Sequence, residues 1–129
     1  MRLYLVRHAD AAPGEPDELR PLTPRGRQQA RELGAQLAGE GVKGAVVLTS
    51  PLLRARETAE AIARSTQAPV EVDERLAPGA TGATTREAVA GKGETVVTVG
   101  HQPDCSEIVL ELAGREQRFA PASFTEVEL

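Results

Sequence analysis

Short apolar runs alternate with helix-like patterns along most of this 129-residue chain, and this alternation constrains the fold more than any other feature. The run at 95–99 is β-branched at every position, which favours a strand. Strands that alternate with helices are typical of βαβ units and a largely parallel sheet. We therefore predict an α/β fold, a three-layer α/β/α sandwich with a mainly parallel sheet. Strands are predicted at residues 3–6, 45–48, 70–72 and 95–99, and a final one at 124–129, expected at an edge.

Helix boundary signals support the same interpretation. Thr23 followed by Pro24 predicts a helix start, because Thr caps free N–H groups and Pro fits the first helical position. Gly39 and Gly41 mark the predicted end of this helix, and Ala30, Leu33 and Leu37 form its predicted buried stripe. A second helix is predicted to start at Ser50-Pro51, with Ser50 as its cap, and to run to about residue 65. A short helix is predicted from 86 to 90 after a loop at 79–85. The last predicted helix has Asp104 as its cap, with Glu107 completing a capping box, and Gly114 as its C-cap.

Length and charge limit the classes of protein that the chain can belong to. Its 129 residues fit one domain, predicted to span 1–129. A net charge of −4 gives no basic field that would attract nucleic acid or an anionic membrane. Cys105 is the single cysteine, which excludes an internal disulfide and a cysteine-based zinc site. The apolar stretch before Arg7 is too short for a signal peptide or a membrane span. We expect a cytoplasmic monomer with no nucleic-acid or membrane partner, no bound metal and no cofactor.

Three predicted strands end in reactive or cationic residues. The first leads into Arg7 and His8, the second toward Arg54, and the fourth into His101. In open α/β sheets, ligands bind outside the carboxyl ends of the strands. If these strands are parallel neighbours, both histidines of the chain and two arginines meet in one crevice. Each residue alone has an ordinary structural explanation, but crowded cations without carboxylate partners indicate a site for a dianion such as a phosphoryl group.

Four segments resemble, in order, the motifs of the histidine phosphatase (phosphoglycerate-mutase-like) superfamily. They are Arg-His-Ala at 7–9, Leu-Thr-Pro-Arg-Gly at 22–26, Thr-Ser-Pro-Leu-Leu-Arg-Ala at 49–55 and Val-Gly-His-Gln-Pro at 99–103. They are spread from residue 7 to residue 103, so the resemblance extends over most of the chain. The short length and the Arg-His-x-Asp-Ala pattern at 7–11 are similar to the compact branch of bacterial phosphohistidine phosphatases.

The resemblance implies a role for each motif residue. His8 is the expected catalytic nucleophile, which carries the phosphoryl group as a phosphohistidine intermediate, and His101 is the second catalytic histidine. Arg7 and Arg54 are the expected substrate-binding residues, which with His101 hold the phosphoryl oxygens during transfer. The His8 ring must be neutral to attack, and the surrounding cations are expected to lower its pKa.

Two departures from the family pattern affect the expected chemistry. Ala9 replaces the usual Gly of the first motif and requires ordinary backbone geometry. No carboxylate comes directly after Leu76, where many members carry a Glu that protonates the leaving group, and Asp10 is the nearest substitute in sequence as a possible proton donor. An alkoxide leaving group needs such a donor, whereas a neutral imidazole leaves more easily. We therefore expect phosphohistidine in proteins, or another activated phosphoryl donor, as the substrate.

Two other functions remain open at this point. The first is a small-metabolite phosphomonoesterase or mutase, although the short chain gives little material for the lid that a mutase needs. The second is a non-catalytic phosphate-binding module. A cysteine phosphatase does not fit, because Glu111 stands where the C-x5-R pattern after Cys105 requires Arg. The expected partner is a phosphorylated protein or a small phosphorylated substrate.

Overall fold

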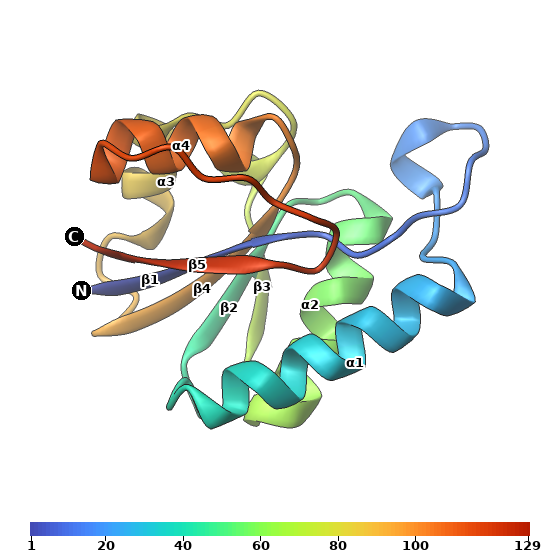
Figure 1. Cartoon of the computed structure of the whole chain (residues 1–129), viewed down its shortest axis with the longest axis horizontal. Coiled ribbons are helices and arrows are strands. Elements are labelled where there is room, and N and C mark those ends of the chain that lie inside the picture. Colours follow the sequence, from blue (N-terminus) through green and yellow to red (C-terminus); the bar gives the residue numbers. More distant parts are fainter.

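The computed structural model describes residues 1–129 and has a five-stranded sheet at its centre (Figure 1). The strand order is β3-β2-β4-β1-β5. The elements along the chain are β1 (Arg2–Arg7), the 3₁₀ turn η1 (Asp17–Leu19), α1 (Pro24–Gly39), β2 (Val46–Thr49), α2 (Leu53–Thr66), β3 (Val70–Val72), the 3₁₀ turn η2 (Glu74–Leu76), α3 (Gly82–Val89), β4 (Thr95–Gly100), α4 (Asp104–Ala113) and β5 (Phe124–Glu128).

The sheet is parallel except at one edge. Strand β4 pairs in parallel with both β1 and β2, and β3 pairs in parallel with β2. Strand β5 is antiparallel to β1 and forms the edge, as predicted. Arg7 lies opposite Gly100 and Thr49 opposite Val99, so the carboxyl ends of β1, β4 and β2 line up side by side. The predicted α/β class with a mainly parallel sheet is confirmed.

Helices cover both faces of the sheet (Figure 1). Neighbouring residues of a strand point to opposite faces, and Leu5 and Val6 accordingly belong to different apolar clusters. Val6 packs with residues of α1 and α2, including Leu33 and Ile62, while Leu5 lies in the cluster that holds Ile108 of α4. The chain therefore forms three layers, with α1 and α2 on one side of the sheet and α3 and α4 on the other.

Local signals predicted some helix ends correctly. The Thr23 hydroxyl accepts a hydrogen bond from the Gly26 N–H at 2.9 Å, and α1 ends at Gly39. Gly114 is the C-cap of α4, with a φ of 68°. The predicted loop at 79–85 is wrong in its second half, because the Thr81 side chain caps a helix that already starts at Gly82.

Two other predicted caps are also wrong. Helix α2 begins at Leu53 without a side-chain cap, and the Ser50 hydroxyl lies 2.7 Å from the His101 ring instead. Helix α4 begins at Asp104 itself, and the Asp104 carboxylate accepts a hydrogen bond from the Gly79 N–H at 2.8 Å rather than capping its own helix. In both cases the polar side chain forms its hydrogen bond with a residue that is distant in sequence.

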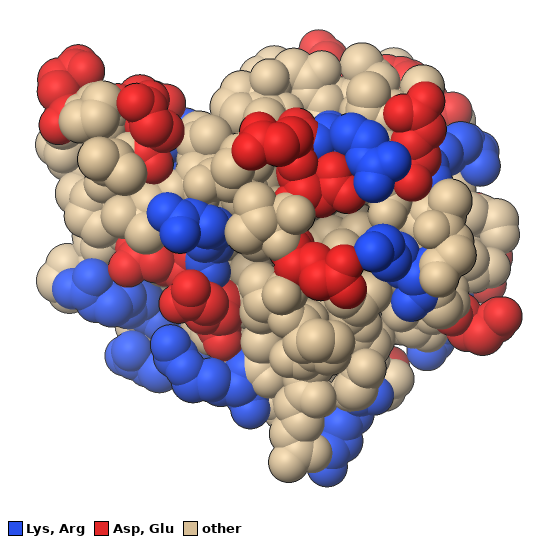
Figure 2. Space-filling model, turned by 180° about the vertical axis from the view of Figure 1, so that it is seen from behind, with Lys and Arg blue, Asp and Glu red and all other residues tan.

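The surface has mixed charge on the face opposite to that of Figure 1. Acidic and basic side chains are interspersed there (Figure 2). None of the helices is both long and apolar enough to cross a lipid bilayer.

Candidate active site

A pocket with a volume of about 360 Å³ lies at the carboxyl ends of β1, β2 and β4. The structure brings together in it all four side chains that the strand-end argument selected. The pocket is lined by Arg7, His8, Asp17, Arg20, Arg54, Pro78, His101 and Gln102. Every lining residue except Pro78 is polar or charged, so the pocket suits a small, highly charged group.

Backbone hydrogen bonds fix the segments that carry these side chains. The His8 N–H donates to the Gly100 carbonyl at 3.0 Å, which extends the pairing of β1 with β4 by one residue. The Ser50 N–H donates to the Val99 carbonyl at 3.0 Å, which does the same for β2. As a result the rings of His8 and His101 lie with their centroids 5.3 Å apart.

The His8 ring is oriented by its own backbone neighbourhood. Its Nδ1 lies 2.7 Å from the Ala9 carbonyl oxygen, which can only accept a hydrogen bond. In the neutral ring Nδ1 therefore carries the proton and Nε2 carries the lone pair. Burial, together with the charges of Arg54 and Arg7, lowers the pKa of His8 below 6.5, which favours this neutral form.

Ala9 fits its position without backbone strain. It is fully buried and is not among the residues with positive φ. Its N–H donates to the Thr58 hydroxyl at 3.0 Å, and that hydroxyl donates to the Arg54 carbonyl at 2.8 Å. The residue after the nucleophile candidate is thus attached to the first turns of α2, which also carry Arg54.

His101 is more deeply buried than His8. The residue is 5% exposed, and its Nε2 lies 2.7 Å from the Ser50 hydroxyl oxygen. Burial, with smaller contributions from the charges of His8 and Arg54, lowers the pKa of His101 to about 3. Its ring is therefore neutral near pH 7.

The two predicted arginines are held by carbonyl groups. Arg7 Nη1 donates to the Phe119 carbonyl at 2.8 Å, in the segment that leads to β5. Arg54 is 7% exposed, and its Nη1 donates to the Asp17 carbonyl at 2.9 Å. Both guanidinium groups are therefore fixed while they line the pocket.

Asp17 and Arg20 are pocket residues that sequence reasoning missed. The Asp17 carboxylate accepts hydrogen bonds from Arg54 Nη2 at 3.2 Å and from Arg20 Nη1 at 3.0 Å. Arg20 Nε also donates to the Ala12 carbonyl at 2.7 Å. These bonds hold the irregular segment 11–21 beside the carboxyl ends of the strands. The place of this segment directly after the first strand was the one available signal. Nothing in its residue pattern indicated which side chains would point into the pocket.

Asp10 and Cys105 do not lie in the pocket. The Asp10 carboxylate accepts a hydrogen bond from the Thr23 hydroxyl at 2.7 Å, so the possible proton donor points to the start of α1. Cys105 is 1% exposed, and burial raises the pKa of its thiol to about 12. No group of three or more His, Cys, Asp or Glu side chains is arranged to hold a metal ion.

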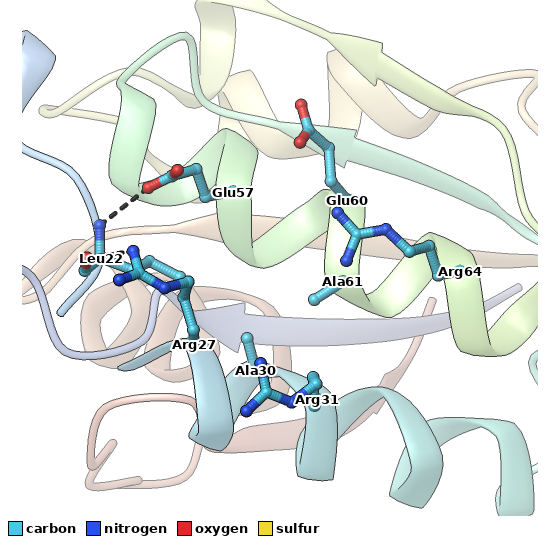
Figure 3. A pocket seen from close by; sticks show the side chains of 8 residues that line it. All are labelled: Leu22, Arg27, Ala30, Arg31, Glu57, Glu60, Ala61 and Arg64. Carbon is cyan, nitrogen blue, oxygen red and sulfur yellow. Dashed lines mark hydrogen bonds between the residues drawn. The ribbon is translucent and has the colours of Figure 1, made fainter. Parts of the chain in front are cut away.

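A smaller hollow of about 80 Å³ lies between α1 and α2 (Figure 3). Its lining includes charged side chains such as Arg27, Glu60 and Arg64, but no histidine. Glu57 accepts a hydrogen bond from the Leu22 N–H at 2.8 Å, drawn as a dashed line. This contact attaches the residues before α1 to α2, and none of the residues that line the hollow also lines the pocket at the strand ends.

Comparison with known proteins agrees with the geometry. The family model of the histidine phosphatase superfamily (branch 1) matches residues 3–90. The phosphohistidine phosphatase SixA of Escherichia coli K12 is 35% identical over 136 residues, which cover 97% of this chain and 80% of that protein. An uncharacterized protein of Picosynechococcus is 40% identical over 115 residues, which cover 83% of this chain and 70% of that protein.

The fold is also similar to that of solved structures. A solved structure of the protein histidine phosphatase SixA complexed with tungstate superimposes with a TM-score of 0.89 and 30% identity, covering 100% of this chain and 88% of that one. The putative phosphohistidine phosphatase SixA from Agrobacterium tumefaciens has a TM-score of 0.83 and 25% identity, with 97% and 89% covered. The chain therefore belongs to the histidine phosphatase superfamily and is a histidine-based phosphatase.

Proposed function

We propose that this enzyme is a phosphohistidine phosphatase, in which His8 takes the phosphoryl group from a histidine of a protein substrate and passes it to water. The observation that carries the proposal is that the pocket has no carboxyl group able to protonate a leaving group. Asp17 is the only carboxylate among the lining residues. Hydrogen bonds from Arg20 and Arg54 lower the pKa of Asp17, so it is ionised near pH 7 and cannot protonate a leaving group.

The leaving group decides which phosphate compounds such a pocket can turn over. An alkoxide needs a proton as the bond to phosphorus breaks, and general acids typically contribute about 10²–10⁴-fold to such steps. Imidazole is a far weaker base than an alkoxide, because the pKa of its conjugate acid is only about 6.5. A pocket that offers arginines and histidines without a protonated carboxyl therefore suits transfer from a phosphorylated histidine ring.

The proposed reaction has two steps. In the first, the substrate's phosphorylated ring carries a proton on its other nitrogen, and His8 Nε2 attacks the phosphorus. The bond between phosphorus and the substrate's ring nitrogen breaks, and its electron pair stays on that ring, which departs as a neutral imidazole. The Ala9 carbonyl, 2.7 Å from His8 Nδ1, stabilises the positive charge that develops on the attacking ring. In the second step, water attacks the phosphorus on His8 and gives inorganic phosphate, a free His8 ring and one released proton.

The arginines would stabilise the charge on the transferred group. Arg7 Nε is buried without a hydrogen-bond partner in the protein, so it is free to bind a phosphoryl oxygen. Arg54 would bind a second oxygen by exchanging the Asp17 carboxylate for the phosphoryl group. Arg7 is already held by the Phe119 carbonyl, and a donor fixed before the reaction stabilises the transition state without further reorganisation.

The relatives and the shape of the site also support a protein substrate. A relative identical at 35% is named a phosphohistidine phosphatase, and its solved namesake binds tungstate, an oxyanion similar to phosphate. The pocket has no apolar wall that would hold the carbon skeleton of a metabolite. The protein surface that carries the phosphorylated histidine would supply the remaining contacts.

A substrate panel tests the proposal. We expect kcat/KM on a histidine-phosphorylated peptide to exceed that on a phosphoserine peptide and on a sugar phosphate by about 100-fold or more, the size of the missing acid's contribution. His8→Ala should abolish turnover and acid-labile phosphate labelling while thermal unfolding stays close to that of the wild type. Equal or higher kcat/KM on the alkyl phosphates would overturn the substrate assignment, and labelling that survives in His8→Ala would overturn the mechanism.

A further inference from the structure

We infer that Ser50 sets the tautomer of His101, so that His101 meets a phosphoryl oxygen with an N–H donor at Nδ1. The inference rests on the proposed function only in taking a phosphoryl group as the occupant of the pocket. Ser50 would then be a positioning residue that acts through His101 without touching the substrate.

The hydrogen bonds of Ser50 leave one place for its hydroxyl proton. The residue is fully buried, and its oxygen accepts a hydrogen bond from the Leu52 N–H at 3.3 Å. The other polar atom bonded to this oxygen is His101 Nε2, at 2.7 Å. A hydroxyl has one proton to donate, so Ser50 satisfies both its donor and its acceptor capacity by donating to Nε2.

The reverse direction of this bond is less favourable. If His101 Nε2 donated to Ser50, the Ser50 proton would be buried without an acceptor and His101 Nδ1 would be a buried lone pair without a donor. Buried groups without partners are costly. Donation by Ser50 leaves a single such group, the Nδ1–H of His101, which has no acceptor in the protein.

A ligand in the pocket would give this N–H its acceptor. His101 is 5% exposed and lines the pocket together with Arg7 and Arg54. A phosphoryl oxygen would supply the acceptor that the protein does not. The low pKa of His101 agrees with a neutral ring, for which the choice of tautomer matters.

The two histidines then share a tautomer but use opposite nitrogens. The Ala9 carbonyl keeps the His8 proton on Nδ1 and leaves the Nε2 lone pair for phosphorus. Ser50 keeps the His101 proton on Nδ1 and directs that N–H to oxygen. Ser50 can do this reliably because its N–H is bonded to the Val99 carbonyl, two residues before His101.

Nitrogen-15 NMR of the ring nitrogens tests the inference directly, since the chain has only two histidines. In the wild-type protein we expect both neutral rings to carry the proton on Nδ1. In Ser50→Ala we expect His101 to shift toward the Nε2–H form while His8 is unchanged. Inhibition by vanadate should weaken by about tenfold, the effect of turning one hydrogen bond to a charged group into a lone-pair contact.

Two further variants separate this role from a packing defect. Ser50→Thr retains the hydroxyl and should retain the Nδ1–H tautomer of His101. Thr98→Val removes another buried hydroxyl that has no partner, on the same strand that leads to His101, and should change neither tautomer nor vanadate inhibition.

A wild-type His101 protonated on Nε2 would overturn the inference, even if Ser50→Ala fails to fold. So would a folded Ser50→Ala protein with an unchanged tautomer and unchanged vanadate inhibition. Neither measurement depends on the substrate. If the enzyme prefers alkyl phosphates, the proposed substrate fails while the role of Ser50 is judged by these results alone.

Discussion

Gly26 is the position where one methyl group should do the most damage to the site. It lies in the first turn of α1, and a Cβ atom there would be 2.0 Å from the Asp10 carbonyl oxygen. Real Cβ atoms almost never approach closer than 3.0 Å, so helix and loop would have to separate by at least about 1 Å. The backbone fixes the position of the Cβ atom, and the atom that it meets is a backbone oxygen. No side-chain rotation can therefore relieve the clash.

The loss of stability in Gly26→Ala can be bounded from these contacts. Overpacking of a close contact costs about 1–3 kcal/mol. The separation also strains the Thr23 N–H bond to the Asp10 carbonyl, 3.0 Å, which is worth about 1 kcal/mol. Ala is favoured over Gly in a helix by about 1 kcal/mol, which offsets part of this. We expect Gly26→Ala to lower the free energy of unfolding by about 1–3 kcal/mol.

Gly39→Ala is the matched control, because it makes the same change at the other end of the same helix. A Cβ at Gly39 meets nothing within 4 Å, so this variant should be as stable as the wild type or slightly more stable. Urea unfolding with an unchanged m value measures both variants. Activity should separate them further, since Asp10 is two residues from His8 and a misplacement of about 1 Å can cost about 100-fold in rate. If Gly26→Ala matches Gly39→Ala in both stability and kcat/KM, then α1 does not approach the backbone of Asp10 as closely as argued above.

Two further predictions concern charge in the pocket. The pKa of His101 is lowered from 6.5 to about 3 in the folded protein, so between these pH values the unfolded chain binds a proton that the folded chain does not. Stability contributed by the neutral ring is therefore lost as pH falls below about 6.5, by up to about 1.4 kcal/mol per pH unit. The wild type should lose stability relative to His101→Asn between pH 7 and 4, and parallel stability curves would contradict this. Asp17→Asn should tighten vanadate inhibition several-fold, because it removes the charge that engages Arg54. Glu18→Gln, an exposed neighbour outside the pocket, should leave inhibition unchanged, and equal effects of the two variants would argue against a specific role for Asp17.

The sheet and the histidine pair were predictable because their signals are local. The β-branched run of β4 and the buried run of β2 indicate strands by composition. Parallel pairing of β1, β4 and β2 then brings their following residues together, whatever the loops do. The convergence of His8 and His101 follows from this register, whereas Arg54 lies in the first turn of α2 and also depends on how the chain continues after β2.

Ser50 and Asp104 were misread for a common physical reason. Each has a side chain suited to capping the helix beside it, and a local pattern contains no information about competing partners. Ser50 bonds to His101, 51 residues away, and Asp104 bonds to Gly79, 25 residues away. Tertiary partners of this kind decide where a polar side chain near a helix start points, and they become visible only once the sheet is assembled.

Asp17 and Arg20 were missed because the segment that holds them has no periodicity to interpret. Their placement depends on bonds to Arg54 on α2 and to the Ala12 carbonyl, which no single stretch of sequence displays. Asp10 was the expected proton donor because it is near His8 in sequence, but its carboxylate accepts a hydrogen bond from the Thr23 hydroxyl at the start of α1.

The unpaired polar atoms connect the fold to the proposed chemistry. Four buried side-chain atoms have no hydrogen-bond partner, and two of them, Arg7 Nε and His101 Nδ1, belong to residues that line the pocket. Each unpaired buried donor costs about 1–3 kcal/mol, a cost that an anion bound between them would remove. The other two are the hydroxyls of Thr85 and Thr98, which are outside the pocket. Both Arg7 and His101 line the same pocket, so a phosphoryl group bound there would supply the acceptor that the protein lacks, and donors already in place stabilise such a group during transfer without further reorganisation.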